Sequence, residues 1–90
     1  MVIEQNFIVT NELGLHARAA TRIVQLANRF TADVELEKDG QRVNGKSIMG
    51  VMMLAASKGT EITLIANGND EKGAIDSLTE LIQQRFGENE

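Results

Sequence analysis

Alternation of apolar and polar side chains predicts β-strands in residues 2–10, in both halves of residues 32–44 and from Thr60 onward. Asp39 and Gly40 divide the middle stretch, because this pair is typical of a type I′ hairpin turn, in which both central residues need positive φ. Glu35 and Glu37 are predicted to face outward. The side chains predicted to face inward are Ile3, Phe7, Val9, Val34, Leu36, Ile62, Leu64 and Ala66.

Three other stretches are predicted to form helices. The first runs from Ala17 to Phe30. A short helix starts near Ser47 and closes at Gly59, since glycine commonly follows a helix C-terminus. The last helix follows Asp70, a typical N-cap residue. Apolar residues at intervals of three and four give the first and last helices one buried stripe each. These stripes are Ala20, Ile23, Val24, Ala27 and Phe30, and Ala74, Ile75, Leu78, Leu81, Ile82 and Phe86.

The predicted order of elements is β-α-β-β-α-β-α. Strands that alternate cleanly are typical of an antiparallel sheet with one face covered and the other exposed to water. Three helices on the covered face give an α+β fold, a two-layer open-faced sandwich. The chain has 90 residues, which is the size of one domain with little room for a deep cavity. We therefore expect a single domain over residues 1–90 with its chemistry near the surface.

The composition argues against several classes of function. The net charge is −4, and the chain has three Phe but no Trp or Tyr, whereas nucleic-acid binding depends on clustered Lys and Arg and on aromatic stacking. The chain has no Cys, so it has no disulfide and no thiolate metal site. Residues 1–12 do not resemble a signal peptide, and no stretch approaches the ~18 apolar residues of a membrane span. We expect a soluble cytoplasmic protein with no membrane or direct nucleic-acid partner.

The one histidine lies in the segment "GLHARAAT", residues 14–21, where a loop is predicted to run into a helix. Free N–H groups at a helix N-terminus bind phosphate and other anions. Imidazole is nucleophilic near neutral pH, and a phosphorylated ring nitrogen stays reactive. The planar guanidinium of Arg18 suits phosphate oxygens and keeps its charge. The segment therefore indicates phosphoryl transfer at His16, with Arg18 holding the phosphoryl group.

The spacing of this segment alone leaves other roles for His16 open. A single histidine near a helix start is usually a polar loop residue. A metal site would need scattered carboxylates as further ligands, because the chain has one His and no Cys. A hydrolase dyad would need a Ser or Asp at a recognisable spacing from His16, and none stands there. We predict no metal and no cofactor.

The segment "KSIMGVMMLAASKG", residues 46–59, places apolar side chains around almost the full circumference of a helix. A two-turn helix on one side of a sheet cannot bury them all. Val51 and Leu54 share the side that faces the core, which leaves Ile48, Met49 and Met52 outside as an apolar patch. Methionine adapts to different partners, and contiguous exposed apolar surface usually marks an interaction site. The alternative is that the other two helices bury more of this short helix, in which case these three side chains would form no exposed patch.

Together, "GLHAR" and "KSIMGVM" resemble the histidine-containing phosphocarrier protein (HPr) family of the bacterial phosphoenolpyruvate-dependent phosphotransferase system. The resemblance covers essentially the whole chain. It implies a phosphoryl carrier rather than an enzyme, and an antiparallel sheet with strand order 1-4-2-3.

The resemblance also implies a role for single residues. His16 would take a phosphoryl group on Nδ1 from enzyme I and pass it to an enzyme IIA domain, while Arg18 neutralises the group. Ser47 would be phosphorylated by an ATP-dependent kinase, so a serine kinase/phosphorylase and a transcriptional regulator join the implied partners. The partner-binding residues would be Leu15, Ala20, Ile48, Met49 and Met52.

The sequence departs from the family at one position, because Ala19 stands where the family usually has proline. Proline is tolerated in the first turn of a helix, and alanine is an excellent helix former that restores one N–H donor. The phosphate-binding logic is therefore kept, while the branch is left open: sugar transport, or a nitrogen-branch regulatory phosphocarrier. Two further alternatives are a co-regulator of transcription that acts through phosphorylated Ser47, and a purely structural interaction domain.

Overall fold

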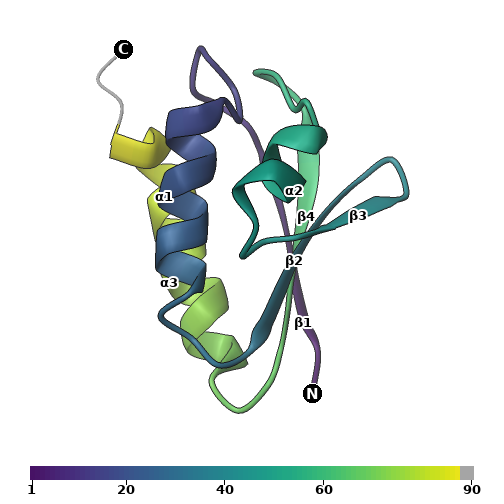
Figure 1. Ribbon diagram of the computed structural model, residues 1–90, viewed down its shortest axis with the longest axis vertical. Coiled ribbons are helices and arrows are strands. Elements are labelled where there is room, and N and C mark those ends of the chain that lie inside the picture. The colour runs from purple at the N-terminus through teal and green to yellow at the C-terminus, as the bar shows by residue number, and fades with distance from the viewer. Residues whose placement is uncertain (88–90) are drawn as a thin grey trace.

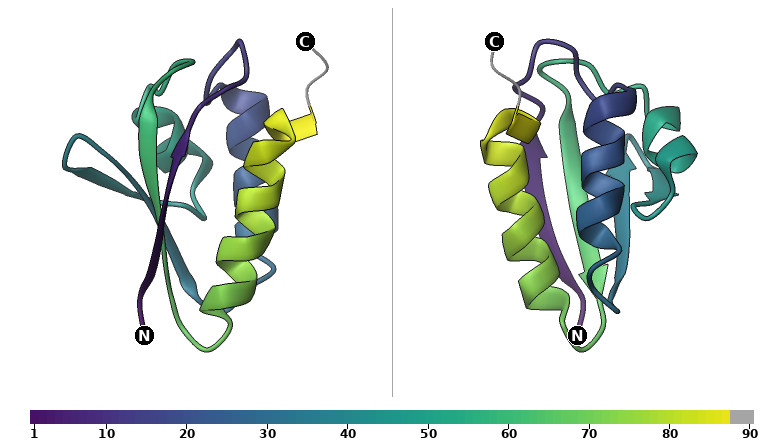
Figure 2. Two further views of the ribbon diagram at one scale, coloured as in Figure 1. Left: turned by 180° about the vertical axis from the view of Figure 1, so that it is seen from behind. Right: turned by 60° about the vertical axis from the view of Figure 1, so that its left-hand side comes forward.

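The computed structural model describes residues 1–87. Its elements are β1 (Ile3–Ile8), α1 (Ala17–Ala27), β2 (Asp33–Lys38), β3 (Gln41–Asn44), α2 (Ile48–Met53), β4 (Glu61–Asn67), α3 (Glu71–Gln83) and a short 3₁₀ turn, η1 (Arg85–Gly87). This order confirms the predicted β-α-β-β-α-β-α arrangement. Helices α1 and α3 lie side by side against one face of the sheet, and the short α2 lies beside β3 and the N-terminal half of α1 (Figures 1 and 2).

The sheet is antiparallel, and its strand order β1-β4-β2-β3 is the one that the resemblance implied. The last strand in the sequence, β4, pairs with both β1 and β2. The β2–β3 hairpin turns through Asp39 and Gly40, whose φ angles of 50° and 83° confirm the predicted turn with two positive φ values. The fold class is therefore the open-faced α+β sandwich expected from the sequence.

The core lies between the sheet and the helices. The inward-facing residues of β2 and β4 are at most 1 % exposed, as the alternation predicted. On the edge strand β1, Ile3 and Phe7 are only partly buried but pack against the same core. The helices contribute Ala19, Ala20, Ile23, Val24 and Ala27 from α1, and Ala74, Ile75, Leu78 and Ile82 from α3.

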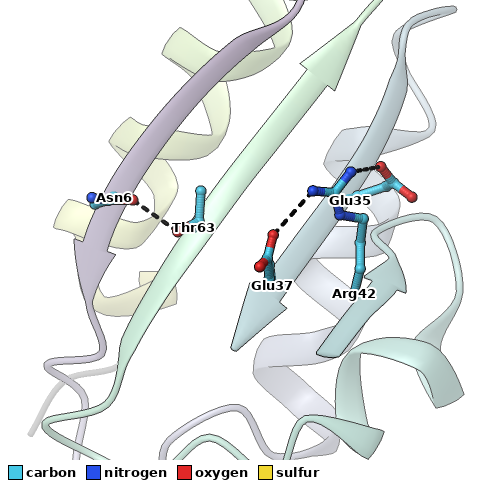
Figure 3. A network of polar contacts seen from close by, with 5 residues as sticks. All are labelled: Asn6, Glu35, Glu37, Arg42 and Thr63. Atoms are coloured by element: carbon cyan, nitrogen blue, oxygen red, sulfur yellow. Dashed lines mark hydrogen bonds and ion pairs between the residues drawn. The ribbon is translucent and has the colours of Figure 1, made fainter. Parts of the chain in front are cut away.

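The opposite face of the sheet carries polar side chains that pair across strands (Figure 3). The hydroxyl of Thr63 donates to the side-chain carbonyl of Asn6 at 2.8 Å. Arg42 contacts Glu37 at 3.1 Å and Glu35 at 3.5 Å, and the bond to Glu37 raises the pKa of Arg42. Exposed ion pairs of this kind add little stability, so backbone pairing and the core on the helix-covered face contribute most to the stability of the sheet.

Two helices end earlier than the sequence predicted. Helix α1 stops at Ala27, not Phe30, where Asn28 donates its side-chain amide to the Val24 carbonyl at 3.0 Å. Phe30 leaves the helix, and its carbonyl accepts from the Lys46 ammonium at 2.8 Å. Helix α2 stops at Met53, not Gly59, because Ala55 adopts a positive φ of 50°. The residues after α2 bond to the segment that follows β1, where the Gly59 N–H donates to the Val9 carbonyl at 2.7 Å.

The two ends of α3 also differ in detail from the prediction. Phe86 is buried as expected, but it follows the end of α3 and has a positive φ of 58° instead of a helical one. Asp70 takes the N-cap position without capping the helix with its side chain. Its carboxylate instead accepts from the backbone N–H groups of Thr31, at 3.0 Å, and Ala32, at 2.8 Å. These bonds lower the pKa of Asp70 and fasten the α1–β2 loop to the start of α3.

Candidate functional site

A tight loop between β1 and α1 carries the histidine to the surface. The Asn11 carbonyl accepts from the Gly14 N–H at 3.2 Å, and the Asn11 side-chain amide donates back to the Gly14 carbonyl at 2.8 Å. Gly14 has a positive φ of 67°, and a Cβ there would lie 2.5 Å from the Ala56 carbonyl oxygen. The Leu15 N–H donates to that same oxygen at 2.9 Å. The loop is thus anchored before the chain reaches His16.

His16 is the N-cap residue of α1, at the junction between loop and helix that the sequence predicted. Its backbone is extended, with φ −78° and ψ 180°, and its carbonyl accepts the first helical bond from the Ala20 N–H at 2.8 Å. The ring Nδ1 accepts from the Arg18 N–H at 3.3 Å. A nitrogen that accepts carries a lone pair, so this bond assigns the proton of the neutral ring to Nε2. The nucleophilic lone pair therefore faces the helix N-terminus.

The start of α1 is electropositive. The first N–H groups of a helix have no acceptor within the helix, and the aligned peptide dipoles add positive potential there. Helix α1 contains no acidic residue, and its Arg18 is exposed two residues after His16. Backbone donors thus face the imidazole, and a permanent positive charge lies on the same first turn of the helix, which suits an anionic group on Nδ1.

Ser47 is the N-cap residue of α2. Its hydroxyl oxygen accepts from the Gly50 N–H at 3.0 Å, and its side chain stays partly exposed. The capping geometry explains why the helix begins at Ile48, since a serine at this position satisfies one of the free donors of the first turn.

Helix α2 presents an apolar surface to solvent. Val51 and Leu54 are buried, with 0 % and 2 % exposed, which confirms the predicted inner face. The exposed fractions of the outer side chains are 39 % for Ile48, 75 % for Met49, 42 % for Met52 and 64 % for Met53. We call these four residues the α2 apolar surface. Met53 was not predicted to belong to the patch from the sequence.

The structure corrects two of the partner-binding residues. Leu15 is 4 % exposed and Ala20 is 0 % exposed, so neither side chain is available to a partner. Leu15 anchors the loop in the core, and Ala20 lies on the buried stripe of α1. Both residues therefore belong to the core beneath the site instead of to its surface.

The sequence did not identify the contacts that hold the loop. Asn11 is 0 % exposed, although an asparagine between a strand and a helix is usually a surface residue. Lys58, in the loop before β4, pairs with Glu12, and this bond lowers the pKa of Glu12. The Lys58–Glu12 pair joins residues that only the folded chain brings together, so no local pattern signals it. Asn11 bonds the nearby Gly14 carbonyl, but its residue type does not signal that it is buried.

Two classes of site find no support in the part of the chain that is described. Within residues 1–87, no three His, Cys, Asp or Glu side chains gather in a way that could hold a metal ion. Over the same residues, no helix has the length and apolar character needed to cross a bilayer.

An open-faced sandwich with one histidine at an anion-binding helix terminus defines a class of small α+β phosphocarrier proteins. A family profile described as "PTS HPr component phosphorylation site" matches residues 3–84. The chain belongs to the HPr family of phosphocarriers of the phosphotransferase system.

Relatives and solved structures agree with this assignment. The chain is 47 % identical to the phosphocarrier protein HPr of Cupriavidus necator over 99 % of this chain and all of that protein. It is 54 % identical to the HPr-like protein Crh of Bacillus subtilis over 92 % of this chain and 98 % of Crh. The crystal structure of HPr from Thermoanaerobacter tengcongensis superposes with a TM-score of 0.94 at 44 % identity, covering 98 % of this chain and 99 % of that one.

Proposed function

We propose that the protein accepts a phosphoryl group from enzyme I on Nδ1 of His16 and donates it to an enzyme IIA domain. The observation that carries this proposal is the direction of the ring, whose Nδ1 faces the Arg18 N–H at the N-terminus of α1. A phosphoryl group on that atom would lie among donors that already point toward it.

Phosphoryl transfer needs one bond to form and one to break. The Nδ1 lone pair attacks the phosphorus atom, and the bond between phosphorus and the donor breaks as the Nδ1–P bond forms. The ring keeps its proton on Nε2. Phosphorylation breaks the 3.3 Å bond from the Arg18 N–H to Nδ1. The phosphoryl oxygens instead accept from the free N–H groups of the first turn, including that of Ala19, where the family usually has proline. The Arg18 guanidinium supplies the opposing charge.

Docking of partners is proposed to use the α2 apolar surface. It lies beside the N-terminal half of α1, which carries Arg18 and no carboxylate (Figure 1). A partner with an apolar patch bordered by acidic residues would match both features.

Regulation is proposed at Ser47. A phosphate on this hydroxyl would place about −1.5 to −2 charges next to Ile48 and Met49. The start of α2 tolerates that charge, whereas an acidic or apolar partner surface would be repelled or poorly desolvated. Modification by a serine kinase would thus reduce docking without unfolding the helix.

One relative favours a second candidate function. Crh of Bacillus subtilis, described as a catabolite repression HPr, matches this chain at 54–55 % identity. The protein would then act mainly as a co-regulator of transcription through phosphorylated Ser47, together with a transcriptional regulator. His16 at a well-formed N-cap argues against this as the sole role. The branch, sugar or nitrogen, depends on which enzyme IIA domain accepts the group.

The test is incubation with enzyme I and phosphoenolpyruvate. The wild-type chain should gain an acid-labile, base-stable phosphoryl group, and His16→Ala should gain none while keeping its thermal melt. Arg18→Ala should slow transfer without abolishing it, because the backbone donors remain. Lys72→Ala, which removes one charge from α3, is the matched control and should transfer at the wild-type rate. Phosphorylation of the His16→Ala variant at the wild-type rate would refute the assignment.

A further inference from the structure

We propose that Asn11 is a positioning residue for phosphoryl transfer, acting through the backbone that leads to His16. The proposal rests on the function proposed for His16. Asn11 does not touch the imidazole in the contacts described above. Its side chain orients the Gly14–Leu15 peptide unit, which directly precedes His16.

The burial of Asn11 is the first observation. Among residues 1–87, it is the one residue with a polar or charged side chain in the fully buried class, at 0 % exposed. Burying an amide costs free energy unless its donors and acceptors are paired. Here the amide donates to the Gly14 carbonyl at 2.8 Å, so its burial is tied to the conformation of this loop.

The second observation is that one peptide unit is held at both ends. Its carbonyl belongs to Gly14 and accepts from Asn11, and its N–H belongs to Leu15 and donates to the Ala56 carbonyl at 2.9 Å. A peptide unit is planar, so two opposed hydrogen bonds fix its orientation. The next residue in the chain is His16. The direction in which His16 leaves the loop therefore depends on the Asn11 amide.

Gly14 makes this dependence stronger. Gly14 has no side chain that could hold the backbone at its positive φ of 67°, and its close approach to Ala56 and Ser57 leaves no room for one. Without the Asn11 amide, glycine can rotate, and the peptide unit would keep only its bond to Ala56. His16 would then reach the Arg18 N–H in a smaller fraction of molecules.

Asn28 provides a matched control on the same helix. Its side-chain amide also donates to a backbone carbonyl, that of Val24 at 3.0 Å, but at the C-terminal end of α1. The variants Asn11→Ala and Asn28→Ala each remove one such bond. Asn11→Asp keeps the size of the side chain and removes its donor.

The experiment measures transfer from enzyme I over a range of concentrations of each variant, below the thermal melts of all of them. Asn11→Ala and Asn11→Asp should lower the maximal rate by roughly tenfold to a hundredfold, because a small misplacement of a reacting group has effects of this order. The half-saturating concentration should stay constant, since the α2 apolar surface is untouched. The ¹⁵N resonances of the His16 ring and the Arg18 amide should move toward values typical of a released cap. Asn28→Ala should stay within about twofold of wild type, as expected for an independent site.

The results distinguish failure of the Asn11 proposal from failure of the function proposed for His16. Asn11 variants that transfer like Asn28→Ala, with unchanged His16 and Arg18 resonances, overturn the proposal. If they do not fold, the wild-type protein gives the answer: phosphorylation of His16 should shift the side-chain amide resonances of Asn11 but not those of Asn28, because coupling between two sites is reciprocal. Unshifted Asn11 resonances would overturn it. A wild-type chain that accepts no phosphoryl group refutes the function proposed for His16, while the ring and amide resonances of the variants still test the role of Asn11.

Discussion

Replacing Gly14 with alanine tests how closely the loop below His16 is packed. The new Cβ would lie 2.5 Å from the Ala56 carbonyl oxygen and 2.9 Å from the Ser57 Cα, and both are backbone atoms that no side-chain rotation can move away. The backbone at Gly14 also has a positive φ of 67°, which favours glycine. Gly40→Ala is the matched control, because Gly40 has a φ of 83° but no atom within 4 Å of its Cβ position.

The structure separates two contributions to the loss of stability. The left-handed conformation costs an alanine about 1–2 kcal/mol, and the stiffer unfolded chain returns about 0.4–1 kcal/mol, at both positions. Overpacking against fixed backbone adds about 1–3 kcal/mol at Gly14 alone. We therefore expect Gly14→Ala to be less stable than Gly40→Ala by about 1–3 kcal/mol, out of roughly 5–13 kcal/mol for a domain of this size.

The assay is a denaturant melt and a thermal melt of wild type and both variants. The difference between the variants should appear as roughly 5–20 °C in Tm, since 1 kcal/mol corresponds to about 4–8 °C in a domain of 60–100 residues. Gly14→Ala should also transfer phosphoryl groups more slowly, because the shift that relieves the clash moves the chain just before His16. Equal melts for the two variants would show that the loop has room at Gly14 and would refute the packing argument.

Ala19→Pro should change the free energy of unfolding by less than about 1 kcal/mol, because position 19 lies in the first turn of α1, where proline breaks no helix hydrogen bond; a denaturant melt with a much larger loss would contradict this. Ser47→Ala should cost ~1 kcal/mol and Ser47→Asp much less, since Asp also accepts the Gly50 N–H. Ser47→Asp should nonetheless slow transfer from enzyme I, and an unchanged rate beside a sharp fall in the melt would leave Ser47 only a cap. Hydrogen bonds from Thr31 and Ala32 lower the pKa of Asp70, so its contribution to stability is present above about pH 4, the ordinary pKa of Asp, and is lost as the pH falls through the lowered value. Asp70→Asn should therefore flatten the fall of Tm below about pH 4, and a profile parallel to that of wild type would count against the pairing.

Local patterns predicted the elements but not all of their ends. The β2–β3 turn was predictable because Asp39-Gly40 itself determines the geometry. The end of α2 was not, because Ala55 carries no signal for the positive φ it adopts. That conformation arises where the chain leaves the helix to bring Ala56 and Gly59 to their partners near β1. Long-range pairing thus overrode the glycine that marks a helix end in sequence.

The candidate site shows the same division. The position of Ser47 as an N-cap follows from its residue type, and that of His16 follows from the helix predicted to start at Ala17. The burial of Leu15 does not, because it depends on how the loop packs against Ala56 and Ser57. Asp70 likewise has the residue type of a cap, yet its carboxylate serves Thr31 and Ala32, which only the tertiary fold brings near.

Because β4 lies between β1 and β2 in the sheet, the sheet cannot be completed until β4 has been synthesised. Ile3 pairs with Ala66, and Val34 pairs with the same residue from the other side. During synthesis from the N-terminus, β1 and β2 therefore have no strand between them until residues 61–67 have been made, and the β2–β3 hairpin is the one local pairing within residues 1–87 that can form earlier. Pairings this distant in sequence make folding slow compared with local ones. A ribosome-bound chain that stops before β4 would hold the histidine segment without the sheet that supports it, so the ability to carry a phosphoryl group should be acquired late in translation and in a single step.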